Sequence, residues 1–236
     1  MLTIALAQLE IHAGDPRYNT TAMKKQIAQA KQASCDVIIF PELAIPGYFI
    51  GDVWDQPDFI NDCVRFGEEI QAASDGITII YGNVAKEENR VNPDGRLRKY
   101  NAMFIAQNGK LITPQNSPYP FYIKTLLPNY REFSDIRYFT SLMEVAQERH
   151  AFPEDFLSPV TLTFSNNRTL HIGPLICEDS WDDNYPFKPM SYLSQHYDID
   201  LFVNISNSPF TQGKTQRRHR LFGKAIESMQ RPAVYV

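Results

Sequence analysis

Short hydrophobic runs alternate with longer stretches of helical periodicity in the first third of the chain. The runs at 2–9, 37–40 and 77–84 are rich in apolar and β-branched residues and predict strands. The stretches at 19–34 and 57–74 repeat their apolar residues every three or four positions and predict helices. This part of the chain therefore predicts strands and helices in alternation.

Turn signals separate the apolar runs in the middle of the chain and predict antiparallel hairpins. Those at 92–95 and 108–109 flank a strand at 100–106. Asn166 and Asn167 mark a second hairpin, and its strands are predicted at 160–164 and 169–176. The stretch at 140–158 predicts a short helical insertion.

Alternation of helices and strands returns in the last third of the chain. Helices are predicted at 188–197 and 214–230, and strands at 201–206 and 232–236. With helices near both ends and hairpins between them, we expect an α/β fold in which sheet packs on sheet and helices cover the outside. The chain reaches its last residue inside a predicted strand, which is more typical of a fragment than of a finished domain.

Composition narrows the class of protein. A chain of 236 residues with 43% hydrophobic residues can bury one sizeable core, which excludes intrinsic disorder and favours one domain. The net charge of -4 gives no general attraction to nucleic acid or to an anionic membrane. No apolar run reaches the roughly 18 residues of a membrane helix, and no basic segment precedes an apolar one at the N-terminus. We expect a cytoplasmic protein that acts on a small molecule.

Several familiar kinds of site are missing from the sequence. The three cysteines are widely spaced and odd in number, which favours neither a disulfide framework nor a metal site, and the five histidines have no partner at ligand spacing. There is no phosphate-binding loop, dinucleotide fingerprint, serine elbow or His-Glu-x-x-His motif. A hydrolase with this sequence would use neither zinc nor a serine elbow.

Three residues near predicted strand ends remain as candidates for chemistry. Glu42 directly follows a buried strand and is either a surface loop residue or a functional acid. Lys124 lies in an apolar stretch, so it either extends to the surface or has a partner in the interior. Cys177 ends an apolar strand just before two acids, where it is either a structural thiol or a nucleophile. Cys35 and Cys63 fit the structural alternative better.

Together these residues resemble the Glu-Lys-Cys set of the nitrilase superfamily of carbon-nitrogen hydrolases, in the same chain order and each in its local motif. The flanking segments Pro41-Glu42-Leu43, Pro46-Gly47-Tyr48, Leu127-Pro128-Asn129-Tyr130, Ile176-Cys177-Glu178-Asp179 and Asn204-Ile205-Ser206 are similar to the glutaminase domain of glutamine-dependent NAD+ synthetases. The resemblance implies a nitrilase-like four-layer α-β-β-α sandwich over residues 1–236. It also implies that the domain is truncated at its C-terminal end and that the synthetase domain is absent.

The resemblance assigns catalytic roles. Cys177 would attack the amide carbon, Glu42 would transfer protons, and Lys124 with the backbone N–H of Glu178 would hold the oxyanion. A nearby Lys124 ammonium is expected to favour the Cys177 thiolate. A second acid would steady Lys124 and the substrate. We select Glu132, with the shorter Asp135 as the alternative.

The resemblance also assigns a substrate and partners. Glutamine would contact Tyr48, Tyr130, Phe133, Glu178, Ser208 and Lys214, the last standing where relatives carry arginine. The glutaminase reaction would need no cofactor, whereas ATP, Mg and deamido-NAD+ would serve the missing synthetase domain. A homo-oligomer is expected. The basic run at 217–220 is read as a solvated helix face rather than an RNA-binding one, since no aromatic platforms accompany it.

Two other functions stay open at this point. One is a stand-alone nitrilase-type amidase acting on another small amide, against which the segment around Asn129 argues. The other is an inactive binding or scaffold subunit, which requires that Glu42, Lys124 and Cys177 lie apart in the fold.

Overall fold

The first sheet joins strands from the N-terminal half of the chain. The structure, a computed structural model, describes residues 2–165, 167–209 and 211–236. Strands β1 (Ile4–Leu6), β2 (Val37–Ile39) and β3 (Thr78–Val91) are parallel neighbours, and β4 (Leu97–Gln107) runs antiparallel to β3. The short strands β5 (Lys110–Leu111) and β6 (Tyr122–Ile123) pair with β4. β2 is fully buried, as its Val-Ile-Ile sequence predicts for a strand covered on both faces.

The second sheet has the order β10-β9-β8-β7. Strands β7 (Val160–Thr163) and β8 (Thr169–Ile176) form the expected antiparallel hairpin. Asn166 of its predicted turn lies outside the described residues. β9 (Leu201–Ile205) and β10 (Ala233–Tyr235) add to β8 in parallel, so the ends of β8 and β9 lie at the same edge of the sheet.

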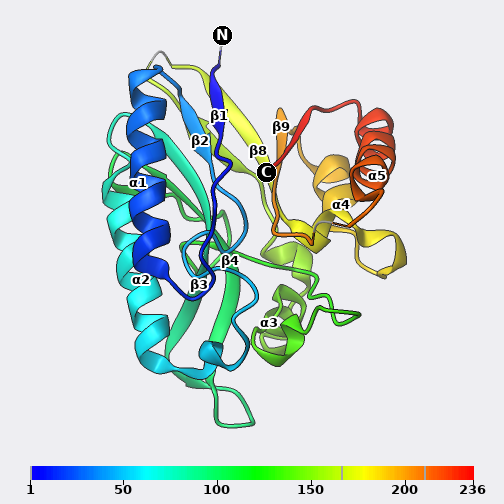
Figure 1. The fold of residues 1–236 in the computed structure, drawn as a ribbon. Helices are drawn as coiled ribbons and strands as arrows, with labels where there is room; N and C mark the ends of the chain where they lie inside the picture. Colours follow the sequence, from blue (N-terminus) through cyan, green and yellow to red (C-terminus); the bar gives the residue numbers. More distant parts are fainter. Residues whose placement is uncertain (1, 166, 210) are drawn as a thin grey trace.

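Helices cover the outer face of each sheet. Helices α1 (Pro16–Gln32) and α2 (Pro57–Ala72) lie on one side of the molecule, whereas α4 (Pro189–His196) and α5 (Lys214–Met229) lie on the other (Figure 1). Apolar residues of the two sheets, among them Ile39 and Val203, form a core between them. The expected α-β-β-α sandwich is therefore confirmed.

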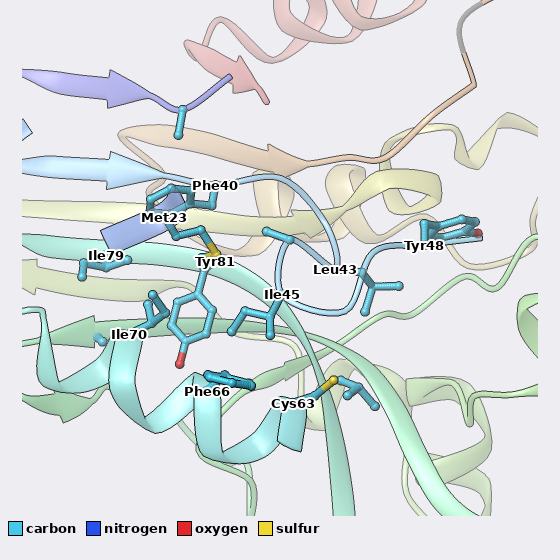
Figure 2. Close-up of a cluster of buried hydrophobic side chains, with 14 of the residues drawn as sticks. Met23, Phe40, Leu43, Ile45, Tyr48, Cys63, Phe66, Ile70, Ile79 and Tyr81 are labelled. Atoms are coloured by element: carbon cyan, nitrogen blue, oxygen red, sulfur yellow. The ribbon is translucent and has the colours of Figure 1, made fainter. Parts of the chain in front are cut away.

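The core under α1 and α2 also holds the segment that follows β2. Figure 2 shows Phe66 and Ile70 of α2 gathered against Tyr81 of β3 and against Ile45 of that segment. Burial of this segment fixes the position of the acid it carries, Glu42, which comes three residues after the end of β2.

The remaining elements are short. Helix α3 (Leu142–Glu148) confirms the predicted insertion and begins with a capping box between Ser141 and Glu144. The 3-10 helices are η1 (Gly51–Asp55), η2 (Asp135–Arg137), η3 (Pro153–Asp155), η4 (Cys177–Ser180) and η5 (Asp182–Asn184). Helix α1 starts three residues earlier than predicted, because Asp15 caps it by accepting the N–H of Tyr18. Within the described residues, no helix combines the length and apolar character needed to cross a membrane.

Candidate active site

Glu42 is fully buried and accepts three hydrogen bonds. Its Oε1 accepts from Asn101 Nδ2 at 2.8 Å and from Lys124 Nζ at 2.7 Å, and its Oε2 accepts from the backbone N–H of Asn207 at 2.9 Å. The backbone at Glu42 lies directly on Gly82 of β3, where an added Cβ would come within 2.7 Å of the Glu42 Cα. Close packing therefore holds this carboxylate at the end of β2, and the surface alternative for Glu42 is excluded.

Lys124 follows β6 and is buried between two carboxylates. Its Nζ donates to Glu42 Oε1 at 2.7 Å and to Asp135 Oδ2 at 2.8 Å. Burial alone would lower the pKa of this ammonium, but Asp135 and Glu42 outweigh it and raise the pKa well above its usual value. Lys124 therefore stays charged, and the surface alternative is excluded for it as well.

Asp135, rather than Glu132, is the second acid on Lys124. The prediction for Glu132 is wrong, because Arg131 has a left-handed φ of 54° and the Glu132 side chain ends up exposed. Asp135 begins η2, is 4% exposed, and also accepts a hydrogen bond from the Tyr48 hydroxyl. The shorter side chain reaches the lysine because its backbone folds inward, with Asp135 N–H bonded to Pro128 O.

Cys177 stands where β8 passes into η4, and its backbone is held in an uncommon conformation. Its φ of 47° is left-handed, which L-residues with a Cβ adopt at a cost. Asn204 of β9 offsets this cost with both ends of its amide. Its Oδ1 accepts from the N–H of Cys177 at 2.8 Å, and its Nδ2 donates to Cys177 O at 3.2 Å. The strained turn points the thiol toward the cavity that it lines.

Burial keeps the thiol of Cys177 protonated. Desolvation, followed by the nearby Glu42 carboxylate, raises the pKa of Cys177 to about 12. Lys124 and the hydroxyls of Ser206 and Ser208 act in the opposite direction. The ammonium thus favours the thiolate as expected, but burial and Glu42 outweigh it, so Cys177 rests as a protonated thiol.

Asp179 links the loop of the cysteine to the loop of the lysine. Its Oδ1 accepts from the N–H groups of Thr125 at 3.1 Å and Leu126 at 2.8 Å, and its Oδ2 accepts from that of Ile176 at 3.1 Å. Burial raises the pKa of Asp179 to about 7, although these donors favour the charged form. The sequence offered one signal for this role, an acid directly after Cys177 and Glu178.

A cavity of about 490 Å³ opens over Cys177. The predicted substrate residues that line it are Tyr130, Phe133, Glu178, Ser208 and Lys214, and the exposed Glu132 lies at its wall too. Tyr48 does not line this cavity. Its hydroxyl contacts Asp135, and its side chain borders a second cavity of about 190 Å³. Its assignment as a substrate contact stays a prediction.

Side chains of opposite charge line the cavity. Glu178 accepts hydrogen bonds from the Tyr130 hydroxyl at 3.0 Å and from the Tyr185 hydroxyl at 3.0 Å. Burial raises the pKa of Glu178, and the two phenols counteract the rise. Lys214 and Arg217 of α5, which also line the cavity, lie over the Trp181 ring at 6.0 and 5.7 Å from its centre. Sequence reasoning missed Tyr185, which stands in no motif, and read Arg217 only as part of a basic run on a solvated helix face, whereas it lines the cavity.

The three candidate residues are therefore assembled at one end of the two sheets. Glu42 and Lys124 are in direct contact, and both act electrostatically on Cys177. An inactive scaffold required them to lie apart, so this hypothesis is not supported. Among the described residues, no group of three His, Cys, Asp or Glu side chains could hold a metal ion.

The sandwich with a Glu-Lys-Cys site defines a class of enzyme. The sequence profile named carbon-nitrogen hydrolase matches residues 3–229, and the chain belongs to this family. It is 28% identical to the glutamine-dependent NAD(+) synthetase of Synechocystis sp., covering all of this chain and 39% of that protein. It is 26% identical to the synthetase of Thermotoga maritima, covering 90% of this chain and 31% of that protein.

Solved structures agree with this assignment. The glutamine-dependent NAD+ synthetase of Acinetobacter baumannii in complex with ADP is 27% identical with a TM-score of 0.77, covering 99% of this chain and 37% of that one. An amidase from Nesterenkonia sp. matches with a TM-score of 0.72 at 15% identity, covering all of this chain and 75% of that one, and this match shows the shared fold alone. The chain spans between 31 and 39% of the length of the curated synthetases it matches.

Proposed function

We propose that this chain hydrolyses the side-chain amide of L-glutamine to glutamate and ammonia. The observation that carries the proposal is the pairing, in one cavity, of a Cys177 nucleophile with opposite charges suited to an α-amino acid. Glu178 supplies a carboxylate, and Lys214 and Arg217 supply cations that have no ion-pair partner among the described side chains. A zwitterionic amino acid needs both kinds of contact.

Acylation begins at the protonated thiol. As Sγ attacks the amide carbon, the S–H bond breaks, its proton passes to Glu42 and a C–S bond forms. The carbonyl oxygen becomes an oxyanion, which the Lys124 ammonium and the N–H of Glu178 stabilise. When this intermediate collapses, the C–N bond breaks and Glu42 returns the proton to the leaving group, which departs as ammonia. The product is a γ-glutamyl thioester.

In deacylation, water is the attacking group and the sulfur of Cys177 is the leaving group. A water molecule attacks the thioester carbon while Glu42 takes one of its protons, and a second oxyanion forms at the same donors. The C–S bond then breaks, and Glu42 returns the proton to sulfur. Glutamate leaves with the water oxygen, and the free thiol is restored.

The charges of the cavity account for substrate choice. Glu178, held by two phenols, binds the α-ammonium, while Lys214 binds the α-carboxylate. Arg217, one helical turn after Lys214 and over the same indole, supplies the planar guanidinium that a lysine lacks. An uncharged small amide would leave these three groups without partners, which disfavours the stand-alone amidase.

The ammonia would serve ATP-dependent synthesis of NAD+ from deamido-NAD+ in a synthetase domain. Support comes from the similar synthetases, each of which is much longer than the matched segment. ATP and Mg2+ would belong to that domain and not to the glutaminase reaction.

Ammonia and glutamate measured after incubation with glutamine test the proposal. Wild type should release both in equal amounts, Cys177→Ala should release neither, and the control Cys35→Ala should behave as wild type. Butyramide, which lacks both α-groups, should be hydrolysed at least about a hundredfold less efficiently, since it forgoes two charged contacts. Equal turnover of the two amides would refute glutamine as the substrate, and turnover by Cys177→Ala would refute the nucleophile.

A further inference from the structure

A row of hydroxyl groups leads from the nucleophile into the protein. Ser208 Oγ lies 3.6 Å from Cys177 Sγ, and Tyr235 Oη lies 3.2 Å from Ser208 Oγ. Ser206 Oγ donates to Tyr235 Oη at 2.7 Å. The two serines follow β9, and Tyr235 lies in β10, opposite Asn204 in the register of the two strands. The hydroxyl row and the amide that fixes the Cys177 backbone thus share one pair of strands.

The charges around the sulfur make such donors necessary. The single positive charge of Lys124 is shared between the buried side chains of Glu42 and Asp135, so these three groups together carry a net negative charge while Glu42 is ionised and no net charge once Glu42 holds a proton. Negative charge on Sγ therefore meets little net attraction from them. In a buried site, a charged atom without water must be stabilised by hydrogen-bond donors.

The direction of the hydroxyl row follows from proton counting. Each hydroxyl has one proton to donate. That of Ser206 goes to Tyr235 at 2.7 Å rather than to Ser208 at 3.4 Å. Tyr235 is then free to donate to Ser208, and Ser208 to Sγ. Hydrogen bonds that all point toward a negative end polarise and strengthen one another.

We propose that Tyr235 is a positioning residue for the nucleophile: its hydroxyl turns the Ser208 hydroxyl so that Ser208 donates to Cys177 Sγ whenever the sulfur is negative. This occurs in the thiolate and again when sulfur leaves the thioester. No proton is gained or lost along the row, because the hydroxyls only rotate. The inference rests on Cys177 as the nucleophile and not on the identity of the amide.

Other ionisable groups also face the sulfur and must stay unchanged in a test. They come from the segments after β2 and β6, from the loop before η2 and from α5, and they are Glu42, Lys124, Tyr130 and Lys214. The guanidinium of Arg218 lies 5.2 Å from the centre of the Tyr235 ring. Tyr235→Phe keeps that ring and removes only the hydroxyl, and residue 235 does not line the cavity.

Alkylation of Cys177 by iodoacetamide at pH 8, read by peptide mass spectrometry without any amide substrate, measures how readily the thiolate forms. Tyr235→Phe should lower the rate about threefold to tenfold, in the range of one weakened hydrogen bond to an anion. Ser208→Ala should lower it at least as much. The double variant should be no slower than Ser208→Ala, because Tyr235 acts through Ser208. The control Tyr81→Phe, which removes a buried hydroxyl bonded to Gly67, should alkylate as wild type.

An unchanged alkylation rate in Tyr235→Phe would overturn the inference, and so would additive effects in the double variant. If thermal unfolding shows that Tyr235→Phe does not fold, the alkylation rate of Ser206→Ala tests the inference in its place. That variant removes the donor behind Tyr235 together with the direct effect of Ser206 on the thiol, so alkylation should slow, and a wild-type rate would overturn the inference. Because no glutamine is present, a failure of glutamine hydrolysis is seen separately in the ammonia assay.

Discussion

At the scale of single residues, the site is built around one buried lysine that has two carboxylate partners. Lys124 and Glu42 could be selected from the sequence, because a charged residue in an apolar stretch needs a partner or a function. The identity of the second acid could not. Glu132 was selected from the resemblance to the superfamily, but after the left-handed turn at Arg131 its side chain is exposed, and Asp135 contacts Lys124 instead. Local backbone conformation, which spacing does not encode, decided between them.

Replacing the lysine should uncouple this cluster. Lys124→Met leaves two buried carboxylates without their cation, so the free energy of unfolding should fall by about 3–5 kcal/mol. Amide hydrolysis should fall by about a hundredfold or more through loss of an oxyanion donor. Denaturant unfolding and steady-state kinetics measure the two effects. The control is Lys99→Met, which breaks the ion pair between the buried Lys99 and the exposed Asp55, outside the cavity lining, and should lose stability but keep activity. Wild-type kinetics in Lys124→Met would contradict the role of Lys124.

The raised pKa of Cys177 predicts an unusual pH profile. With a pKa of about 12, the thiol is almost fully protonated at neutral pH. The thiolate fraction, and with it the rate of alkylation by iodoacetamide, should rise about tenfold per pH unit between pH 7 and 10 without a plateau. A peptide with a free cysteine, alkylated in parallel, should level off near pH 9. A plateau for Cys177 below pH 8 would contradict the protonated resting state.

At the scale of elements, the candidate residues Glu42, Lys124 and Cys177 follow the ends of strands, and close packing fixes their positions relative to one another. The sequence predicted the strand before Glu42 from the continuous apolar run at 37–40, and the strand before Cys177 from the hairpin signal at residues 166 and 167. The hydrogen bonds that join the loops around Lys124 and Cys177 were not predictable. Asp179 and Asn204 act on backbone groups far away in sequence, and such contacts leave no periodic signal. Pairing between strands also carried β3 beyond its predicted end at residue 84, as far as Val91.

Gly82 of β3 tests this alignment without altering a candidate residue. An added Cβ would lie 2.3 Å from Leu43 N and 2.7 Å from the Glu42 Cα, so the segment must move. Gly82→Ala should lower kcat about tenfold or more, because displacements of about 1 Å in a catalytic group have large effects. Steady-state kinetics measure the change in kcat, and thermal unfolding shows whether the variant is folded. Gly223→Ala in α5, where the added Cβ meets nothing within 4 Å, should keep wild-type activity. An active Gly82→Ala enzyme would show that Glu42 does not need this position.

At the scale of the whole molecule, two sheets meet so that Glu42 after β2 and Lys124 after β6 lie close to Cys177 at the end of β8. The sandwich was predictable from the order of elements and from the family resemblance, and the core between the sheets confirms it. The second sheet contributes the nucleophile with its hydroxyl row, and the first contributes the acid and the lysine. The site therefore depends on the packing of one sheet against the other.

Labelling by a chloroketone analogue of glutamine tests the central claim most directly, because it requires both a reactive Cys177 and recognition of the amino-acid end. Peptide mass spectrometry should find the label on Cys177 alone, with protection by glutamine but not by butyramide. Cys177→Ala should take up none, and Lys214→Ala combined with Arg217→Ala should be labelled far more slowly. Label on Cys35 or Cys63 in place of Cys177, or equal protection by both amides, would contradict a glutamine-specific cysteine hydrolase.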